Sequence, residues 1–417
     1  MQKVKYVAQM QIGRLSFLIA FLLLGIFGKE GVVCAQQVEE SPLPKVSLLL
    51  ASPVIEEPYT LYGHAGLRIH ATSRGSDSVY NWGLFDFEAP GFVRKFVYGQ
   101  TDYMIGVSST SDYMAYYLER GSSVTELVLN MDHASISRLE ILLQENMLPE
   151  NRVYRYNFFY DNCATRPVDV IERAIGGQLQ LPPADPMTFR EMINAAERPM
   201  PWLVFGTDLA VASPADREAT PREQLFLPHR IAELLPESQM LMPDGSTRNL
   251  VKKVSIYRST HEKEELAKLG ESPINEPAIV TFLYAFLSGV VLFFASRSGR
   301  RRWKVAARLL NVVTLSVAGF IGLTLAFLSF VSLHPAMSPN ANLLFLHPFH
   351  MLVGIPLLFF PRAVKVIRIY HVIVLLGLLG YLGAVLILPQ QFNIAFVGIL
   401  FALLFECIYQ LWESGNR

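Results

Sequence analysis

The stretch RVYRYNFFYDNCATRPVDVIERAIGG, residues 152–177, indicates most directly which fold this chain adopts. Its first half, as far as Asn162, is rich in aromatic residues and predicts a β-strand. Its second half has the apolar spacing of a helix and stops at two glycines, which is typical of a helix C-terminus. Asn162 is the expected N-cap, so Cys163 is expected in the first turn of that helix. A strand that leads into a helix predicts a mixed domain of strands and helices.

Cys163 is the candidate nucleophile of this domain. In the first turn of a helix the macrodipole favours the thiolate over the thiol. A nucleophilic cysteine also needs a base that takes its proton. The alternative is a small apolar side chain packed under the helix. The polar pair Asp161-Asn162 before the cysteine and the pair Thr165-Arg166 after it favour the functional interpretation.

The N-terminus has the features of a secretory signal peptide: a basic start, the apolar run LSFLIAFLLLGIF and small residues at its end. We expect cleavage after Ala35, so that residues 1–35 are the signal peptide; an uncleaved signal anchor is the alternative. Cleavage removes Cys34 and leaves Cys163 in the soluble part and Cys407 in the last apolar run. Neither has a nearby partner, and a lone cysteine in an exported protein is either accidental or reactive.

The remaining chain divides into a mixed domain, a proline-rich extension and a membrane region. The mixed domain is expected over residues 36–177. Its further strands are expected at 45–52, 61–72, 79–87, 103–109 and 122–131, and its further helices at 92–99, 112–121 and 134–148. Residues 178–276 are less regular, and we expect a helical extension that links the domain to the membrane.

Residues 277–417 are expected to form an all-α membrane domain of about five spans. The apolar runs are 278–296, 309–333, 342–360, 371–389 and 392–412, each near the ~20 residues that cross a bilayer core. Lys and Arg gather in the connectors RSGRRRWK and PRAVKVIR, whereas HPAMSPNAN and PQQF contain neither. The positive-inside rule therefore predicts a multi-pass membrane protein whose basic connectors are cytoplasmic and whose mixed domain lies outside.

The overall charge bears on the partners of the chain. Its 417 residues include 36 basic and 36 acidic side chains, so the formal net charge is zero. We therefore expect no nucleic-acid partner. The apolar runs predict that the lipid bilayer is a partner instead.

The base for the candidate nucleophile is expected to be a histidine. The soluble part contains His64, His70, His133, His229 and His261. His64 differs from the others because it lies in an expected strand, YGHAGLRI, between two glycines that leave room for a substrate. Alternation puts Gly66, Arg68 and His70 on the same face of that strand as His64. A purely structural role of His64 is the alternative.

A third group is expected to orient the imidazole of His64. The next strand, VYNWGLFDF, offers Asn81 and Asp86. Asn81 is preferred, because a hairpin between the two strands would pair it nearest to His64.

Four stretches together carry a resemblance to a known family: YGHAGLR from Tyr62, YNWGLFDF from Tyr80, YGQTDYMIG from Tyr98 and YRYNFFYDNCATR from Tyr154. They resemble the Lnb N-terminal periplasmic domain family, once classed as a domain of unknown function. The similarity covers about residues 45–177 and continues through ASPADREATPREQLFLP, residues 212–228. With the five-span tail, the whole chain resembles the Lnb lipoprotein N-acyltransferase family. The soluble domain also resembles circularly permuted NlpC/P60 papain-like enzymes, in which the histidine precedes the cysteine.

The resemblance implies an α+β papain-like domain followed by an all-α membrane domain. It also implies transfer of an acyl chain from a phospholipid, through a cysteine thioester, to the N-terminal amine of a diacylated lipoprotein. The expected catalytic residues are Cys163, His64 and Asn81, and the expected substrate-binding residues are Tyr62, Arg68, Asp161, Asn162 and Arg166. No metal and no soluble cofactor are expected.

Two other functions stay open. The first is a membrane-tethered cysteine hydrolase, a peptidase or amidase, in which water attacks the thioester. The second is an envelope scaffold or partner subunit without enzymatic activity. The loop SLHPAMSPNANL, residues 332–343, is a further candidate, since His334 and Asn340 lie on the expected outer side and can touch a lipid head group. A simple turn between two spans is the alternative for this loop.

Overall fold

The computed structural model describes residues 43–416, apart from residues 87, 89, 243, 271–273 and 361. The chain divides into two units, Met1–Ser41 and Pro42–Arg417, and the following description concerns the second unit. The predicted signal peptide lies outside the described residues, as does the start of the domain expected over 36–177.

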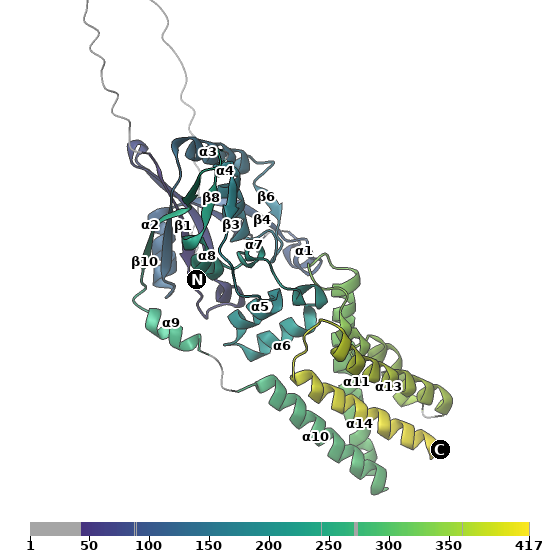
Figure 1. The fold of residues 1–417 in the computed structure, drawn as a ribbon. Coiled ribbons are helices and arrows are strands. Elements are labelled where there is room, and N and C mark those ends of the chain that lie inside the picture. Colours follow the sequence, from purple (N-terminus) through teal and green to yellow (C-terminus); the bar gives the residue numbers. More distant parts are fainter. Residues whose placement is uncertain are drawn as a thin grey trace, which may run out of the picture. The chain divides into compact units, whose positions relative to one another are not determined.

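A seven-stranded antiparallel sheet forms the centre of the soluble domain, in the order β10-β5-β1-β2-β3-β4-β6 (Figure 1). The strands are β1 Lys45–Ala51, β2 His64–Ala71, β3 Ser76–Leu84, β4 Asp102–Ser109, β5 Val124–Leu129, β6 Val153–Arg155 and β10 Val251–Tyr257. The five strands expected between residues 45 and 131 are all present. The aromatic stretch before Asn162 is a strand only over β6, because the chain then turns back at an isolated bridge between Asn157 and Asp161.

Helices cover both faces of this sheet. The helices are α2 Thr110–Glu119, α3 His133–Met147 and α4 Thr165–Ile175. Leu48 of β1 belongs to the core that the sheet forms with α3 and α4, and the next residue, Leu49, packs with Tyr113 of α2. Both faces of β1 are therefore buried, which explains why its sequence is an unbroken apolar run.

The extension after residue 177, which was expected to be helical, contains both helices and strands. It contains α5 Phe189–Glu197, α6 Pro201–Ala210, α7 Pro221–Gln224, α8 Pro228–Leu234 and α9 Glu262–Lys268. It also contains a small sheet of β7 Gln178–Gln180, β8 Gln239–Leu241 and β9 Thr247–Asn249. Strand β10 then returns to the central sheet and pairs with β5. This pairing joins residues far apart in sequence and makes the end of the extension part of the central sheet.

A buried arginine fixes α5 against α6. Arg190 is 1% exposed, and its Nε lies 2.6 Å from Asp216 Oδ1 while its Nη1 lies 3.1 Å from Asp208 Oδ1. Its Nη2 also donates to the carbonyl of Val211. Such a buried charge is tolerated because every side of the guanidinium has an acceptor. The ion pairs therefore hold the N-terminal end of α5 in a defined position.

The membrane region contains four helices that are long and apolar enough to cross a bilayer. They are α10 Glu276–Arg297, α11 Arg301–Phe330, α13 Val364–Ile387 and α14 Ala395–Gly415. The prediction of five helical spans is not confirmed. The expected third span, 342–360, is divided into η5 Ala341–Leu344, one π-helical turn η6 His350–Gly354 and α12 Ile355–Phe359.

The composition of this divided segment explains its shape. Pro348 and Pro356 cannot donate the backbone hydrogen bonds of a continuous helix. The segment lies directly against α11, where a Cβ added at Gly319 would meet the backbone nitrogen of Met351 at 2.5 Å. A Cβ at Gly322 would meet His347 equally closely. The two glycines thus permit close contact with a segment that is not a regular helix.

Side-chain amides join the membrane region to α6. Asn340 Nδ2 donates to the carbonyl oxygens of Leu209 and Ala210 at 2.8 and 3.0 Å, and Asn393 Nδ2 donates to Asp208 at 2.9 Å. These bonds hold the connector between α11 and η5 and the connector between α13 and α14 against the soluble domain.

Candidate active site

One cavity of about 420 Å³ contains the candidate nucleophile and the candidate base. Its wall comes from the soluble domain and from the connector that follows α11. Polar and reactive side chains in this wall include Tyr62, His64, Asn162, Cys163, Glu197 and His334. Most of the remaining wall is apolar, with Phe158, Ile193 and Met337 among its members. A mostly apolar cavity with a few converging polar groups is typical of a ligand site.

Asn162 positions the cysteine just before the N-terminus of α4. Its Oδ1 accepts hydrogen bonds from the backbone N–H groups of Ala164 and Thr165 at 2.8 and 2.9 Å. Its Nδ2 donates to the carbonyl oxygens of Phe158 and Phe226, both at 2.8 Å. These bonds stabilise the turn before α4, whereas the N-cap position of α4 itself is Ala164, so the prediction of Asn162 as the N-cap is wrong. The amide is fully used by the backbone, so its role is to position Cys163 and not to bind a substrate.

Cys163 lies in the turn before α4, which begins at Thr165, and not in the first helical turn as expected. The side chain is half-buried. The N–H groups of Ala65 and of Cys163 itself point at its sulfur. Gly83 lies opposite, where an added Cβ would be 3.3 Å from the Cβ of Cys163. Since the φ of Gly83 is also +89°, glycine is required there by conformation and by space.

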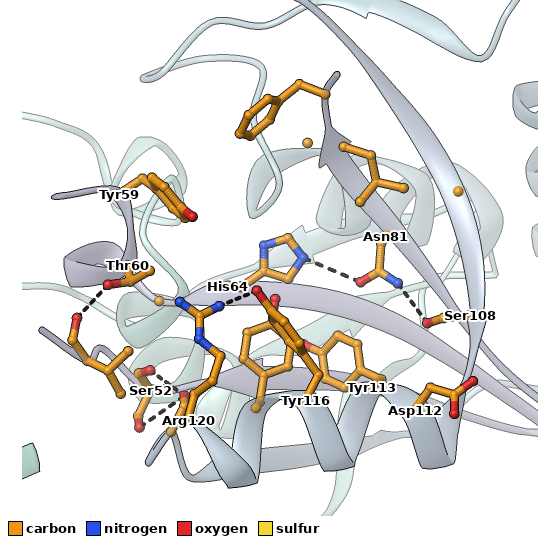
Figure 2. A pocket seen from close by; sticks show the side chains of 18 of the residues that line it. Ser52, Tyr59, Thr60, His64, Asn81, Ser108, Asp112, Tyr113, Tyr116 and Arg120 are labelled. Atoms are coloured by element: carbon orange, nitrogen blue, oxygen red, sulfur yellow. Dashed lines mark hydrogen bonds between the residues drawn. The ribbon is translucent and has the colours of Figure 1, made fainter. Parts of the chain in front are cut away.

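His64 is the first residue of β2 and directly precedes Ala65, whose N–H faces the sulfur. Its Nε2 lies 3.4 Å from Asn81 Oδ1, and Asn81 Nδ2 donates to Ser108 Oγ at 3.2 Å (Figure 2). The imidazole stacks on Tyr117 with ring centroids 5.7 Å apart. The expected hairpin pairs Gly66 with Asn81 and thereby brings the amide to the imidazole.

The surroundings keep both reactive groups neutral. Burial lowers the pKa of His64 to about 4, although the bond from Asn81 opposes this shift. Burial raises the pKa of Cys163 to about 11, although the two backbone N–H groups oppose it. The expectation that the helix favours a thiolate is wrong for this structure. Desolvation of the Cys163 thiolate outweighs the electric field of α4, which starts two residues later.

The raised pKa of Cys163 predicts a particular pH dependence of alkylation. Only the thiolate reacts with iodoacetamide, so the rate at Cys163 should rise about tenfold per pH unit between about pH 7 and pH 10. Peptide-resolved mass spectrometry separates Cys163 from Cys407, which is buried in α14. A rate independent of pH from about pH 6 to pH 9 would instead indicate a preformed thiolate–imidazolium pair.

Glu197 is a cavity residue that the sequence did not indicate. It ends α5 and is 1% exposed. Its Oε1 accepts hydrogen bonds from Tyr62 Oη at 2.5 Å and from Thr207 Oγ1 at 3.0 Å. It lies in the extension after residue 177, far from His64 in the sequence. Only the tertiary fold brings the two into one cavity.

Three of the predicted substrate-binding residues lie outside the cavity wall. Arg68 donates to Asp77 at 2.6 Å and to Glu126 at 2.9 Å, so its charge is already neutralised in the sheet. Asp161 and Arg166 form an ion pair at 2.5 Å with each other. The prediction that these three bind substrate is therefore not supported by the structure. Tyr62 and Asn162 do line the cavity.

The other candidates are distributed as follows. Asp86, the alternative to Asn81, accepts the N–H of Glu88 at an exposed turn and is not a partner of His64. His334 lines the cavity and lies 2.8 Å from the carbonyl oxygen of Phe96. Asn340 is buried against α6 and has no amide hydrogen free for a head group. The cavity wall does not include His70, His133, His229 or His261.

A second cavity of about 440 Å³ adjoins the first (Figure 2). Both are lined by Tyr59, Gly63, His64, Gly83 and Phe85. The second cavity adds the polar groups of Asp112, Tyr116 and Arg120. His64 thus lies where an apolar cavity and a more polar cavity meet.

No group of three or more His, Cys, Asp or Glu side chains within the described part of the chain is arranged to hold a metal ion.

An α+β domain followed by four long apolar helices defines a membrane protein with a soluble domain. Residues 35–195 match the family described as the Lnb N-terminal periplasmic domain, and residues 270–417 match the family described as the Lnb transmembrane domain. The chain belongs to the Lnb family, and its soluble domain is periplasmic. Comparisons with curated proteins and with solved structures found no match.

Proposed function

We propose that this protein is a lipoprotein N-acyltransferase of the bacterial inner membrane. It moves an acyl chain from a phospholipid to Cys163 and then to the N-terminal amine of a diacylglyceryl-cysteine lipoprotein. One observation carries the proposal: the apolar cavity that contains Cys163 and His64 is completed by residues of the connector between α11 and η5. A cysteine site of this kind, built partly by a membrane region, suits a substrate whose acyl chain lies in the bilayer.

The first half of the reaction forms a thioester. His64 takes the proton of Cys163 as the sulfur attacks the ester carbonyl of the phospholipid. The backbone N–H groups of Ala65 and Cys163, which point at the sulfur, are the nearest donors for the developing oxyanion. The ester C–O bond breaks, His64 returns the proton to the leaving oxygen, and lysophospholipid departs. Asn81 keeps the imidazole in position throughout.

The second half transfers the acyl chain. The amine of the acceptor attacks the thioester carbonyl, the C–S bond breaks, and an amide forms. The two adjoining cavities support this step, because together they leave room for the acyl chain and for the acceptor beside His64. The order of residues, with His64 before Cys163, and the packing of α4 on the sheet support a papain-like, permuted NlpC/P60 architecture.

Intact-mass spectrometry of the full-length protein in detergent tests the proposal. After mixing with phospholipid, we expect one added fatty-acyl mass that neutral hydroxylamine removes. A synthetic diacylated lipopeptide is then added, and its triacylated product is measured. Free fatty acid without triacylated product would favour a membrane-tethered hydrolase instead. No adduct and no turnover with either peptide or lipid substrates would favour a scaffold without enzymatic activity.

A further inference from the structure

The carboxyl group of Glu197 has an unusual position in the cavity of the candidate active site. It is 1% exposed. One oxygen accepts two hydrogen bonds, from Tyr62 and Thr207, whereas Oε2 has no hydrogen-bond partner among the described residues. A buried carboxylate without a cation is costly, because nothing replaces the water it has lost.

The charges around this carboxyl group do not provide a cation. Arg190 lies on the same helix, but Asp208 and Asp216 already neutralise it. Burial, and to a smaller extent the negative charge of Asp208, raises the pKa of Glu197 to about 7. The hydrogen bonds from Tyr62 and Thr207 lower it in part. Among the described residues, no Lys, Arg or His side chain forms an ion pair with Glu197, so the carboxyl group suits a positive charge that a substrate brings.

We propose that Glu197 binds the α-ammonium group of the acceptor lipoprotein and removes one of its protons. The inference rests on the proposed acyl transfer and names the residue that recognises the acceptor. An α-amine in water has a pKa of about 8 and is mostly protonated at neutral pH, so it has no lone pair for attack. A carboxylate whose pKa lies close to that of the amine is well matched to take this proton.

The protons balance in the following way. The carboxylate of Glu197 takes one proton from the ammonium group, which leaves a neutral amine. Its nitrogen attacks the thioester carbonyl, a C–N bond forms and the C–S bond to Cys163 breaks. His64 takes the second N–H proton and delivers it to the departing sulfur, so Cys163 is a thiol again. Glu197 releases its proton to water once the triacylated product has left.

Glu197→Gln in the full-length protein tests this role with little change of shape. Glutamine has the same size, and its oxygen still accepts from Tyr62 and Thr207. We expect thioester formation from phospholipid at the wild-type rate, because that half needs no ammonium group. We expect transfer to the diacylated lipopeptide to slow by about 100-fold or more, so the acyl-enzyme mass accumulates.

Two comparisons separate recognition of the amine from a structural role. Hydroxylamine is uncharged at neutral pH and should discharge the wild-type and Glu197→Gln adducts equally fast. Glu191→Gln on the exposed side of the same helix should leave both half-reactions unchanged. Wild-type transfer rates in Glu197→Gln, or an equal loss of both half-reactions, would overturn the inference. Absence of an adduct on the wild-type protein would instead overturn the proposed function.

Discussion

Cys163→Ala should abolish acyl transfer and leave no fatty-acyl adduct on the purified protein. The other described cysteine, Cys407, is buried in α14 and lies outside the wall of the cavity, so it does not take over as nucleophile. Loss of a catalytic nucleophile lowers turnover on the order of 10⁴-fold or more. Intact mass after mixing with phospholipid measures the first half-reaction, and production of triacylated lipopeptide measures the whole.

Cys407→Ala is the matched control, since it also removes one thiol but in the membrane region. Adduct and product should both stay at wild-type levels in that variant. Thermal unfolding of the two variants checks that each is folded. The nucleophile would have to be sought elsewhere if cells that carry Cys163→Ala as their only copy still produced triacylated lipoproteins.

His64→Ala should lower the rate of thioester formation by roughly 10³-fold or more. The reason lies in the pKa of Cys163, which burial raises to about 11. At neutral pH almost all of this thiol is protonated, so it needs a base at the moment of attack. Intact-mass spectrometry of samples quenched at successive times gives the rate of adduct formation directly.

His70→Ala is the control for this variant. His70 lies on the same strand as His64, with Thr72 as its hydrogen-bond neighbour and outside the cavity wall. It should leave the rate of adduct formation unchanged. A His64→Ala protein that forms the adduct as fast as His70→Ala would show that His64 has a purely structural role, which is the alternative interpretation of the sequence.

The parts of the fold that depend on local pattern were predictable from the sequence. The strands β1 to β5 alternate or are continuously apolar, and α4 ends at Gly176 in the left-handed conformation, as its two glycines indicated. The family was also predictable, because the stretches around His64 and Cys163 carry its motifs, and both family matches confirm it. The division of the segment between α11 and α13 was not predictable, because its apolar run, residues 342–360, is as long as a membrane span.

The sequence by itself determined the reactive groups: a lone thiol after an asparagine, a histidine between glycines, and an asparagine on the neighbouring strand. Only the tertiary structure decided what surrounds them. Glu197 enters the cavity from α5, His334 from the membrane region, and β10 completes the sheet from far along the chain. Such contacts depend on packing between distant segments, whereas a sequence pattern reports only the neighbours within one helix or strand. Burial also decided the charge of Cys163, because its effect on the pKa outweighs the electric field of α4 and keeps the side chain a neutral thiol.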